Sequence, residues 1–347
     1  MDSVLYIGTE KGVVTARSSD DRSWEIVERG LESWAVPELA VSPIGANKVF
    51  AGTRGDGVWV SEDFGKSWKK PCYGKRGPGK VRCVTIDPHD SRRLYAGCEP
   101  IDLFVSEDEG KNWDRLDAIW DIPFVATIPY PVATVEPHLR DLAVDPSDPD
   151  ILYAALQVGY MVKSTDRGKS WKLLDDDIDC DVHTIVIDPS DPRHLFIATG
   201  GNGARNGDAP GRALYISEDA GDSWTPAAMN FSNEYSVPIT LDPLDPKRVY
   251  SAVANGAPGG WRRRASGAEA TMIRSDDGGA NWKGIAAGIA SEDFPEAIVV
   301  DEEIAGRLYA GCRNGKMYTS DDGGDNFGAM DFGLEVSNLR CVVLAHA

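Results

Sequence analysis

The sequence predicts an all-β fold in which a four-stranded unit is repeated along the chain. The phrase Ser-x-Asp-x-Gly-x-x-Trp, with Phe for Trp in the last copy, occurs at 61–68, 106–113, 164–171, 217–224, 275–282 and 320–327, and a decayed copy lies at 17–24. Short apolar runs typical of strands flank the phrase. A motif that returns about every 40 to 60 residues indicates units that bury their apolar faces against neighbouring copies. These observations predict a seven-bladed β-propeller with four-stranded blades.

Each phrase is predicted to be the hairpin turn between the third and fourth strands of a blade. Its Asp carboxylate can accept backbone N–H groups, its Gly can take a positive φ, and its Trp can pack beneath the hairpin. The phrase strongly resembles the Asp-box, or BNR, repeat of sialidases and related β-propellers. This resemblance implies that the box is a structural staple on the face opposite the active site. We therefore expect structural roles for Asp63, Asp108, Asp166, Asp219, Asp277 and Asp322.

Two further runs in each repeat predict the first and second strands. The first is apolar and ends in Asp-Pro or a variant of it, at 39–43, 84–88, 142–146, 185–189, 239–243 and 298–301. Because these runs are nearly continuous and rich in β-branched residues, we expect an innermost strand covered on both faces. The second run lies at 48–52, 93–97, 151–155, 194–198, 248–252 and 307–311.

The two ends of the chain complete one blade. Residues 4–8 match a second strand that has no first strand before it, and residues 339–344 match a first strand with nothing after it. We expect the C-terminal strand to join the N-terminal blade, which would remove exposed sheet edges. The whole chain, 1–347, is then a single propeller domain.

Composition excludes several classes of function. The net charge of −19 opposes binding to nucleic acid and to anionic membranes, and no apolar run is long enough for a membrane helix. The N-terminus enters a strand without a preceding signal-peptide pattern. The six cysteines form no CxxC spacing, so we expect free thiols and a cytoplasmic location.

Three insertions are predicted on the face that holds the mouth of the central channel. They are the connection 114–137, with Trp120, Phe124 and Tyr130, the loop 200–212, and the loop 255–270, with Trp261 and the arginines 262–264. Insertions gathered on one face usually mark the binding face.

Polar residues at the start of the first strands suggest a site at this mouth. The position five residues before the Asp-Pro marker, and its equivalent in the closing blade, holds Pro37, Arg82, Arg140, His183, Val237, Glu296 and Arg340. The next position holds Glu38, Cys83, Asp141, Thr184, Pro238, Ala297 and Cys341. Arginine suits a carboxylate or phosphate, and Glu or His can transfer protons. The alternative is that these residues form ordinary ion pairs between blades.

The arginines at the mouth also look like the carboxylate clamp of sialidases. The resemblance implies that Arg82, Arg140 and Arg340 hold a carboxylate, that Tyr235 beside Glu234 is the nucleophile, and that Asp141 or Glu296 is the acid/base. Sialidases have six blades, however, and their Phe/Tyr-Arg-Ile-Pro motif is missing here. We therefore do not expect a standard sialidase.

The leading hypothesis is a cytoplasmic hydrolase or lyase that acts by acid/base chemistry on a small carboxylate-bearing compound, such as a sugar acid or an aromatic acid. The expected catalytic residues are His183, Glu296, Asp141 and Tyr235, and the expected substrate-binding residues are Arg82, Arg140, Arg340, Glu38, His138, Trp120 and Trp261. No cofactor motif is evident, although a neutral His138 or His183 beside these carboxylates would also suit a divalent metal.

Two rival hypotheses remain open. Resemblance extends to seven-bladed Asp-box assembly factors, which implies a binding module that docks a protein on residues 114–137 and 261–264. It also extends to xyloglucan-cleaving Asp-box enzymes, which use two propellers facing across a cleft, whereas this chain predicts one.

Overall fold

The computed structural model describes residues 3–72, 77–128, 135–201, 212–229, 234–331 and 338–347. The fold is all-β, a seven-bladed β-propeller, as the repeats predict. The chain divides into two compact units, one of Met1–Leu156, Val162–Lys172 and Phe332–Ala347, the other of Gln157–Met161 and Leu173–Asp331. None of the helices in the described ranges is long and apolar enough to cross a membrane.

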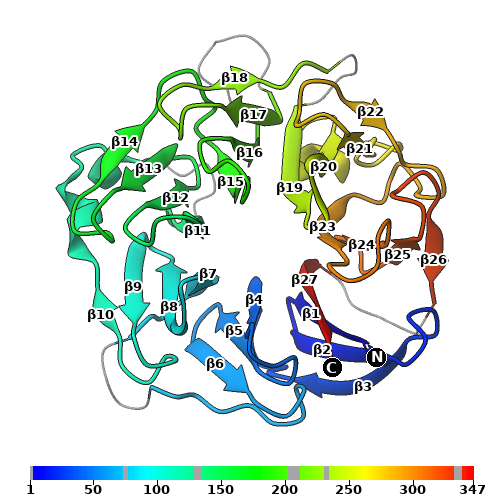
Figure 1. Cartoon of the computed structure of the whole chain (residues 1–347), viewed down its shortest axis with the longest axis horizontal. Coiled ribbons are helices and arrows are strands. Elements are labelled where there is room, and N and C mark those ends of the chain that lie inside the picture. Colours follow the sequence, from blue (N-terminus) through cyan, green and yellow to red (C-terminus); the bar gives the residue numbers. More distant parts are fainter. Residues whose placement is uncertain (1–2, 73–76, 129–134, 202–211, 230–233, 332–337) are drawn as a thin grey trace. The chain divides into compact units, whose positions relative to one another are not determined.

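The first unit holds three antiparallel sheets and the larger part of a fourth, whose residues Met161, Leu173 and Leu174 belong to the second unit (Figure 1). Their strands are β27 (Leu339–His346), β1 (Ser3–Thr9), β2 (Gly12–Ser18) and β3 (Glu25–Gly30); β4 (Glu38–Val41), β5 (Val49–Thr53) and β6 (Gly57–Ser61); β7 (Val81–Asp87), β8 (Asp90–Cys98), β9 (Asp102–Ser106) and β10 (Asp114–Arg115); and β11 (Leu139–Val144), β12 (Leu152–Leu156), β13 (Met161–Ser164) and β14 (Lys172–Leu174). Two 3-10 helices, η1 (Asp117–Asp121) and η2 (Val125–Thr127), lie on the connection to β11. In the second sheet the fourth strand is reduced to one bridge between Val60 and Lys69.

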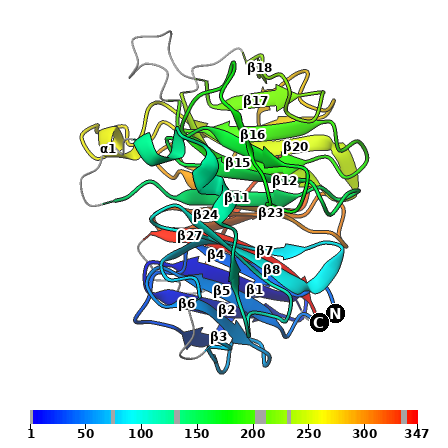
Figure 2. The same cartoon turned by 90° about the vertical axis from the view of Figure 1, so that its left-hand side faces the viewer.

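The second unit holds three four-stranded sheets. Their strands are β15 (Val182–Ile187), β16 (Leu195–Thr199), β17 (Leu214–Ser217) and β18 (Thr225–Pro226); β19 (Tyr235–Asp242), β20 (Asp245–Ala254), β21 (Thr271–Ser275) and β22 (Lys283–Gly284); and β23 (Pro295–Val300), β24 (Leu308–Cys312), β25 (Met317–Ser320) and β26 (Gly328–Met330). Figure 2 shows the short helix α1 (Pro258–Trp261) on the loop between β20 and β21.

Both ends of the described chain belong to one sheet. β27 pairs with β1 in antiparallel register from Ser3 opposite His346 to Thr9 opposite Leu339, and Figure 1 marks both termini at this sheet. The sheet order β27-β1-β2-β3 is the predicted shared blade.

The second strands form the core of the blades. β1, β5, β12, β16 and β24 are buried at every residue. Each second strand places one aromatic side chain, at most 1% exposed, at the same position: Tyr6, Phe50, Tyr95, Tyr153, Phe196, Tyr250 and Tyr309. The first strands are less completely buried, since β7, β15 and β23 mix buried with half-buried residues, although none of their residues is exposed. The first strand lies at the edge of its sheet, whereas the second has a hydrogen-bonded neighbour on each side.

The Asp-boxes are hydrogen-bonded hairpin turns, as predicted. In the box at 61–68, Ser61 Oγ donates to Asp63 Oδ1 at 2.8 Å and accepts the N–H of Gly65 at 2.8 Å. Asp63 accepts the N–H of Ser67 at 2.9 Å and its hydroxyl at 2.6 Å. The five other complete boxes repeat these contacts, with Asn in place of the second Ser in three of them.

The decayed box at 17–24 keeps part of this staple without the glycine. Ser18 Oγ donates to Asp20 at 3.0 Å, and Asp20 accepts the N–H of Ser23 at 2.7 Å. One feature of the complete boxes was not predicted, which is that the residue before the glycine also has a positive φ, as at Phe64 (63°). The turn therefore needs two successive left-handed residues.

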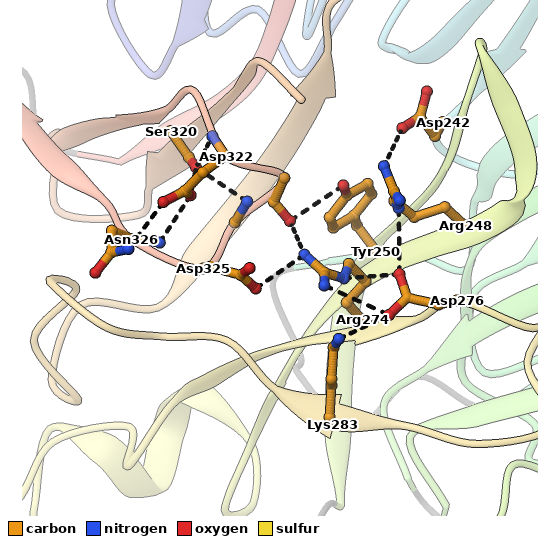
Figure 3. A network of polar contacts seen from close by, with 12 residues as sticks. Asp242, Arg248, Tyr250, Arg274, Asp276, Lys283, Ser320, Asp322, Asp325 and Asn326 are labelled. Carbon is orange, nitrogen blue, oxygen red and sulfur yellow. Dashed lines mark hydrogen bonds and ion pairs between the residues drawn. The ribbon is translucent and has the colours of Figure 1, made fainter. Parts of the chain in front are cut away.

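Boxes also join neighbouring blades within the second unit (Figure 3). Arg274, at the end of β21, donates to the carbonyl of Gly323 in the box of the next blade and pairs with Asp325 at 3.1 Å. Its Nε lies 2.9 Å from Asp276 in its own box, and the hydroxyl of Tyr250 also donates to Gly323. The buried guanidinium thus links two Asp-boxes.

Candidate functional site

The starts of the first strands carry the predicted polar residues in both units. In the first unit, Glu38 begins β4, Arg82 lies on β7, Arg140 and Asp141 lie on β11, and Arg340 lies on β27. In the second unit, His183, Tyr235 and Glu296 lie on β15, β19 and β23.

Three of these residues form an ion pair with the residue that directly follows the second strand of their own blade. Arg340 pairs with Glu10, its Nε donating at 2.8 Å, and Arg82 Nη1 donates to Glu99 at 3.2 Å. In the second unit, Arg313 Nε lies 3.3 Å from Glu296. These three ion pairs form within a blade, whereas the alternative predicted from the sequence was ion pairs between blades.

Glu99 joins two arginines in the first unit. Its side chain is 1% exposed, and Arg54 Nη2 lies 3.0 Å from it while Arg82 lies at 3.2 Å. Nη2 of Arg82 also meets His138 Nε2 at 2.7 Å, and Nδ1 of His138 meets the carbonyl of Glu136 at 2.9 Å. Because a guanidinium can only donate, His138 accepts at Nε2 and carries its proton on Nδ1.

Arg140 differs from the other arginines at the strand starts. Within the described part of the chain, its side chain forms no hydrogen bond and no ion pair within 4 Å, and it is half-buried. The residue that follows the second strand of its blade is the neutral Gln157. Arg140 therefore keeps its positive charge available.

Glu38 and Asp141 occupy the same position in two blades of the first unit, four residues before the marker. Each carboxylate accepts the N–H of the next residue, at 3.3 Å for Leu39 and 2.8 Å for Leu142. Burial, and then the charge of Asp141, raise the pKa of Glu38 to about 8, while Arg140 opposes the shift. Glu38 is nevertheless half-buried rather than sealed, so solvent still reaches it. At neutral pH this site therefore holds one protonated carboxyl beside a second acidic group.

Two cysteines fill the same position on the neighbouring strands. Burial raises the pKa of the Cys83 thiol, and the carboxylates of Asp141 and Glu38 add to the shift. Burial and Glu38 likewise raise the pKa of Cys341. Neither thiol is activated as a nucleophile, because activation requires a lowered pKa. All six cysteines of the chain are free thiols.

His183 and Tyr235, in the second unit, pack against aromatic side chains. His183 Nδ1 meets the carbonyl of Ser236 at 2.6 Å, and its Nε2 lies 3.4 Å from Asp181. The ring of Tyr235 lies 5.3 Å from His183 and 5.3 Å from Trp261. Trp261 is 8% exposed, and its Nε1 donates to the carbonyl of Gly256 at 2.7 Å, so it anchors the 255–270 loop.

The remaining predicted residues are at the surface or outside the described ranges. Trp120 lies on η1 and is 40% exposed. Tyr130 and residues 202–211 of the loop 200–212 lie outside the described residues. Across the ranges that the structure describes, no three His, Cys, Asp or Glu residues gather closely enough to hold a metal ion.

The partners of the predicted mouth residues were not themselves predicted from the sequence. These are Glu10, Arg54, Glu99, Asp181 and Arg313. Four of them, Glu10, Arg54, Glu99 and Arg313, directly follow the second strand of a blade. An alignment of the repeats at that position shows charged residues in these four blades and neutral residues in the other three.

Comparison with known proteins finds an Asp-box repeat in the chain and propellers of similar fold. The BNR-Asp box repeat family matches residues 58–70. An oligoxyloglucan-reducing end-specific xyloglucanase, as assigned in Neosartorya fischeri, is 22% identical over 213 residues, which are 55% of this chain and 23% of the relative. The chain thus spans less than a quarter of that enzyme.

Solved propellers of several kinds are similar in structure. A GH74 enzyme of Niastella koreensis is 15% identical with a TM-score of 0.64, over 93% of this chain and 46% of the other. A Bacteroides fragilis protein, assigned provisionally as a 6-phosphogluconolactonase, is 12% identical with a TM-score of 0.64, over 99% and 98%. YCF48 bound to D1 peptide is 14% identical with a TM-score of 0.58, over 90% and 88%. At these identities the structures establish the fold alone.

Proposed function

We propose that this protein is a hydrolase that cleaves a small carboxylate-bearing compound, such as a sugar acid or an aromatic acid, by acid/base catalysis at Glu38 and Asp141. The observation that carries the proposal is the raised pKa of Glu38, about 8, in a half-buried site shared with Asp141 and Arg140. Pairs of acidic groups whose environments differ commonly divide the roles of acid and base.

In the proposed reaction Glu38 is the general acid and Asp141 the general base. Asp141 takes a proton from water, whose oxygen bonds to the carbon under attack. Glu38 gives its proton to the leaving oxygen as the bond between that oxygen and the carbon breaks. If the base removes a proton from carbon instead, the same two groups perform an elimination, which is the lyase alternative.

The similarity to hydrolase-like propellers supports this proposal. The xyloglucanase and the GH74 enzyme are glycosidases, and glycosidases generally use two carboxyl groups. Because the chain spans 23% of the first and 46% of the second, a long polysaccharide cleft is not part of the proposal. A carbohydrate-active glycosidase for small substrates stays within it.

The test is an activity screen with matched variants. Wild-type protein is assayed against aryl glycosides, aryl glucuronides, lactones and carboxylate esters, followed by Glu38→Gln, Asp141→Asn and the control Glu218→Gln, which alters an exposed carboxyl in an Asp-box. Loss of a general acid or base should lower kcat by about 100-fold or more. Full activity in both site variants would rule out this assignment.

The roles predicted for His183, Glu296 and Tyr235 stay predictions, and the same assay tests them with His183→Ala, Glu296→Gln and Tyr235→Phe. The cytoplasmic location is likewise a proposal, which cell fractionation tests.

A second candidate function is a protein-binding module. Trp120 is a large exposed apolar side chain on the connection 114–137, and YCF48, a solved propeller of similar fold, is bound to a peptide. A pull-down with Trp120→Ser should then no longer recover the stoichiometric partner that wild-type protein retains. Deletion of 259–266 tests the loop 255–270 in the same way. Absence of any stoichiometric partner for wild-type protein would exclude this function.

A further inference from the structure

The repeats provide an internal comparison that separates structural arginines from an available one. In three blades, the charged residue at the start of the first strand pairs with a charged residue directly after the second strand. The pairs are Arg340 with Glu10, Arg82 with Glu99, and Glu296 with Arg313. Because this pair is repeated in blades with different sequences, we infer that it stabilises the fold.

The blade of β11 to β14 breaks this pattern. It keeps the arginine, Arg140, but has the neutral Gln157 at the position that holds Glu10, Glu99 and Arg313 in the three paired blades. In the described ranges, Arg140 has neither a hydrogen bond nor an ion pair through its side chain. It neighbours Asp141 in sequence and acts electrostatically on Glu38. An unpaired charge that the fold elsewhere neutralises is a candidate for ligand binding.

We propose that Arg140 is the specificity-determining residue of the Glu38 and Asp141 site, and that it binds a single carboxylate of the ligand. This inference rests on the proposed function. It assigns anion recognition to Arg140 rather than to Arg340 or Arg82, because Arg340 is paired with Glu10, and Arg82 is held by His138 and by Glu99, which it shares with Arg54.

One guanidinium determines which anion fits. Its planar fork matches a carboxylate, to which it can donate two parallel hydrogen bonds. One positive charge balances one negative charge, whereas a phosphomonoester brings close to two at neutral pH. The neighbouring acidic groups disfavour the second charge. The ligand class is therefore a monocarboxylate.

Ligand binding and the proton on Glu38 are then coupled. The positive charge of Arg140 favours ionised Glu38, so a bound carboxylate that neutralises Arg140 removes this effect. By reciprocity, protonated Glu38 favours carboxylate binding. The substrate thus helps to keep the general acid protonated. Glu38 then adds no negative charge beside the bound carboxylate.

The test compares acids with their neutral amides as probes. Binding of D-glucuronate and D-glucuronamide, and of benzoate and benzamide, is measured by calorimetry on wild-type protein, Arg140→Gln, Arg140→Lys and the control Arg193→Gln. Arg193 is exposed and pairs with Asp191 on the surface. Wild-type protein and Arg193→Gln should prefer an acid over its amide by about tenfold or more, as expected for a hydrogen bond to a charged group. Arg140→Gln should lose the preference, and Arg140→Lys should retain part of it.

Further arms separate this inference from the proposed function. Glu38→Gln should lose turnover but keep the preference for the acid, and Arg340→Gln should lose stability while keeping that preference. Carboxylate affinity of the wild type should also fall as the pH rises through about 8, where Glu38 ionises. Equal affinity for every acid and its amide, an unchanged preference in Arg140→Gln, or tighter binding of inorganic phosphate than of any carboxylate would overturn the inference, whether or not the protein hydrolyses anything.

Discussion

Arg82 and His138 are joined by a hydrogen bond of 2.7 Å that fixes the proton of the histidine on Nδ1. The histidine is fully buried, and the arginine side chain is 10% exposed. This bond gives His138 a positioning role, since the Nε2 lone pair that could take a proton or bind a metal already accepts from Arg82. The substrate contact predicted for His138 stays a prediction.

The first prediction concerns the energy of this bond. His138→Ala leaves a buried guanidinium N–H without its acceptor, so we expect a loss of about 1–3 kcal/mol in the free energy of unfolding. Arg82→Ala should cost a similar amount, and the double variant less than the sum, because the residues interact directly. Chemical denaturation measures all three. Strict additivity would show that the bond contributes nothing.

A second prediction follows from the raised pKa of Glu38. Below about pH 4.5 the carboxyl is protonated in both states, and between 4.5 and about 8 only the folded state keeps the proton. The contribution of Glu38 to the free energy of unfolding therefore falls as the pH rises through this window and is constant above it. Glu38→Gln should stabilise the protein progressively from pH 5 to 8, by roughly 2–4 kcal/mol at pH 9 relative to pH 5.

The measurement is the melting temperature of both proteins over that pH range. The control is Glu218→Gln, whose exposed carboxyl should give no pH-dependent difference. A constant difference between Glu38→Gln and wild type at all pH values would contradict the raised pKa.

A third prediction concerns the Asp-boxes as acid-sensitive staples. Hydrogen bonds from Asn326, first from its side chain and then from its N–H, hold the pKa of Asp322 at about 2. A lowered folded pKa adds stability that is present above the unfolded value of 3.8 and is lost as the pH falls toward 2. Ser320→Ala should cost about 1–2 kcal/mol near neutral pH, because its buried hydroxyl holds Asp322 and Gly324.

Thermal unfolding between pH 2 and 7 checks this behaviour. Asp322→Ala should flatten the acid limb of the stability curve, whereas the exposed Asp331→Ala should change stability by less than about 0.5 kcal/mol. An unchanged acid limb in Asp322→Ala would show that the box does not bind its carboxylate as described.

A fourth prediction concerns the link between blades in Figure 3. Arg274→Met removes the donor to Gly323 and the partner of Asp325, and we expect a loss of about 2–3 kcal/mol because these are charged hydrogen bonds from a buried group. The exposed pair of Arg193 and Asp191 provides the control, and Arg193→Ala should cost at most about 1 kcal/mol. Equal losses in denaturant titrations would refute the structural role of Arg274.

The fold could be predicted from sequence because the repeat phrase specifies its own turn. Ser61, Asp63 and Gly65 sit at the spacing that the hairpin needs, and the same spacing marks every complete copy. The left-handed backbone at Phe64 was not predictable, since nothing in a bulky aromatic side chain favours a positive φ. The hydrogen bonds of the box offset the conformational free energy of this left-handed backbone.

The site could be predicted only in part. Alignment on the Asp-Pro marker identified Glu38, Asp141 and Arg140 as residues at strand starts, which they are. It could not separate Arg140 from Arg82, because that difference depends on Glu99, which comes close only when the second strand folds back. The raised pKa of Glu38 likewise depends on burial, which a list of residues does not contain.

The pairing of β27 with β1 joins residues such as Ser3 and His346, which lie 343 positions apart in the chain. Contacts so distant in sequence form slowly. One edge of β1 therefore keeps its backbone N–H and C=O groups unpaired while the intervening sheets fold. During that interval the equivalent strand of a second molecule offers the same register. At high protein concentration, refolding chains would therefore exchange strands at the pairing of β27 with β1 and form domain-swapped oligomers. Dilution during refolding should favour the monomer.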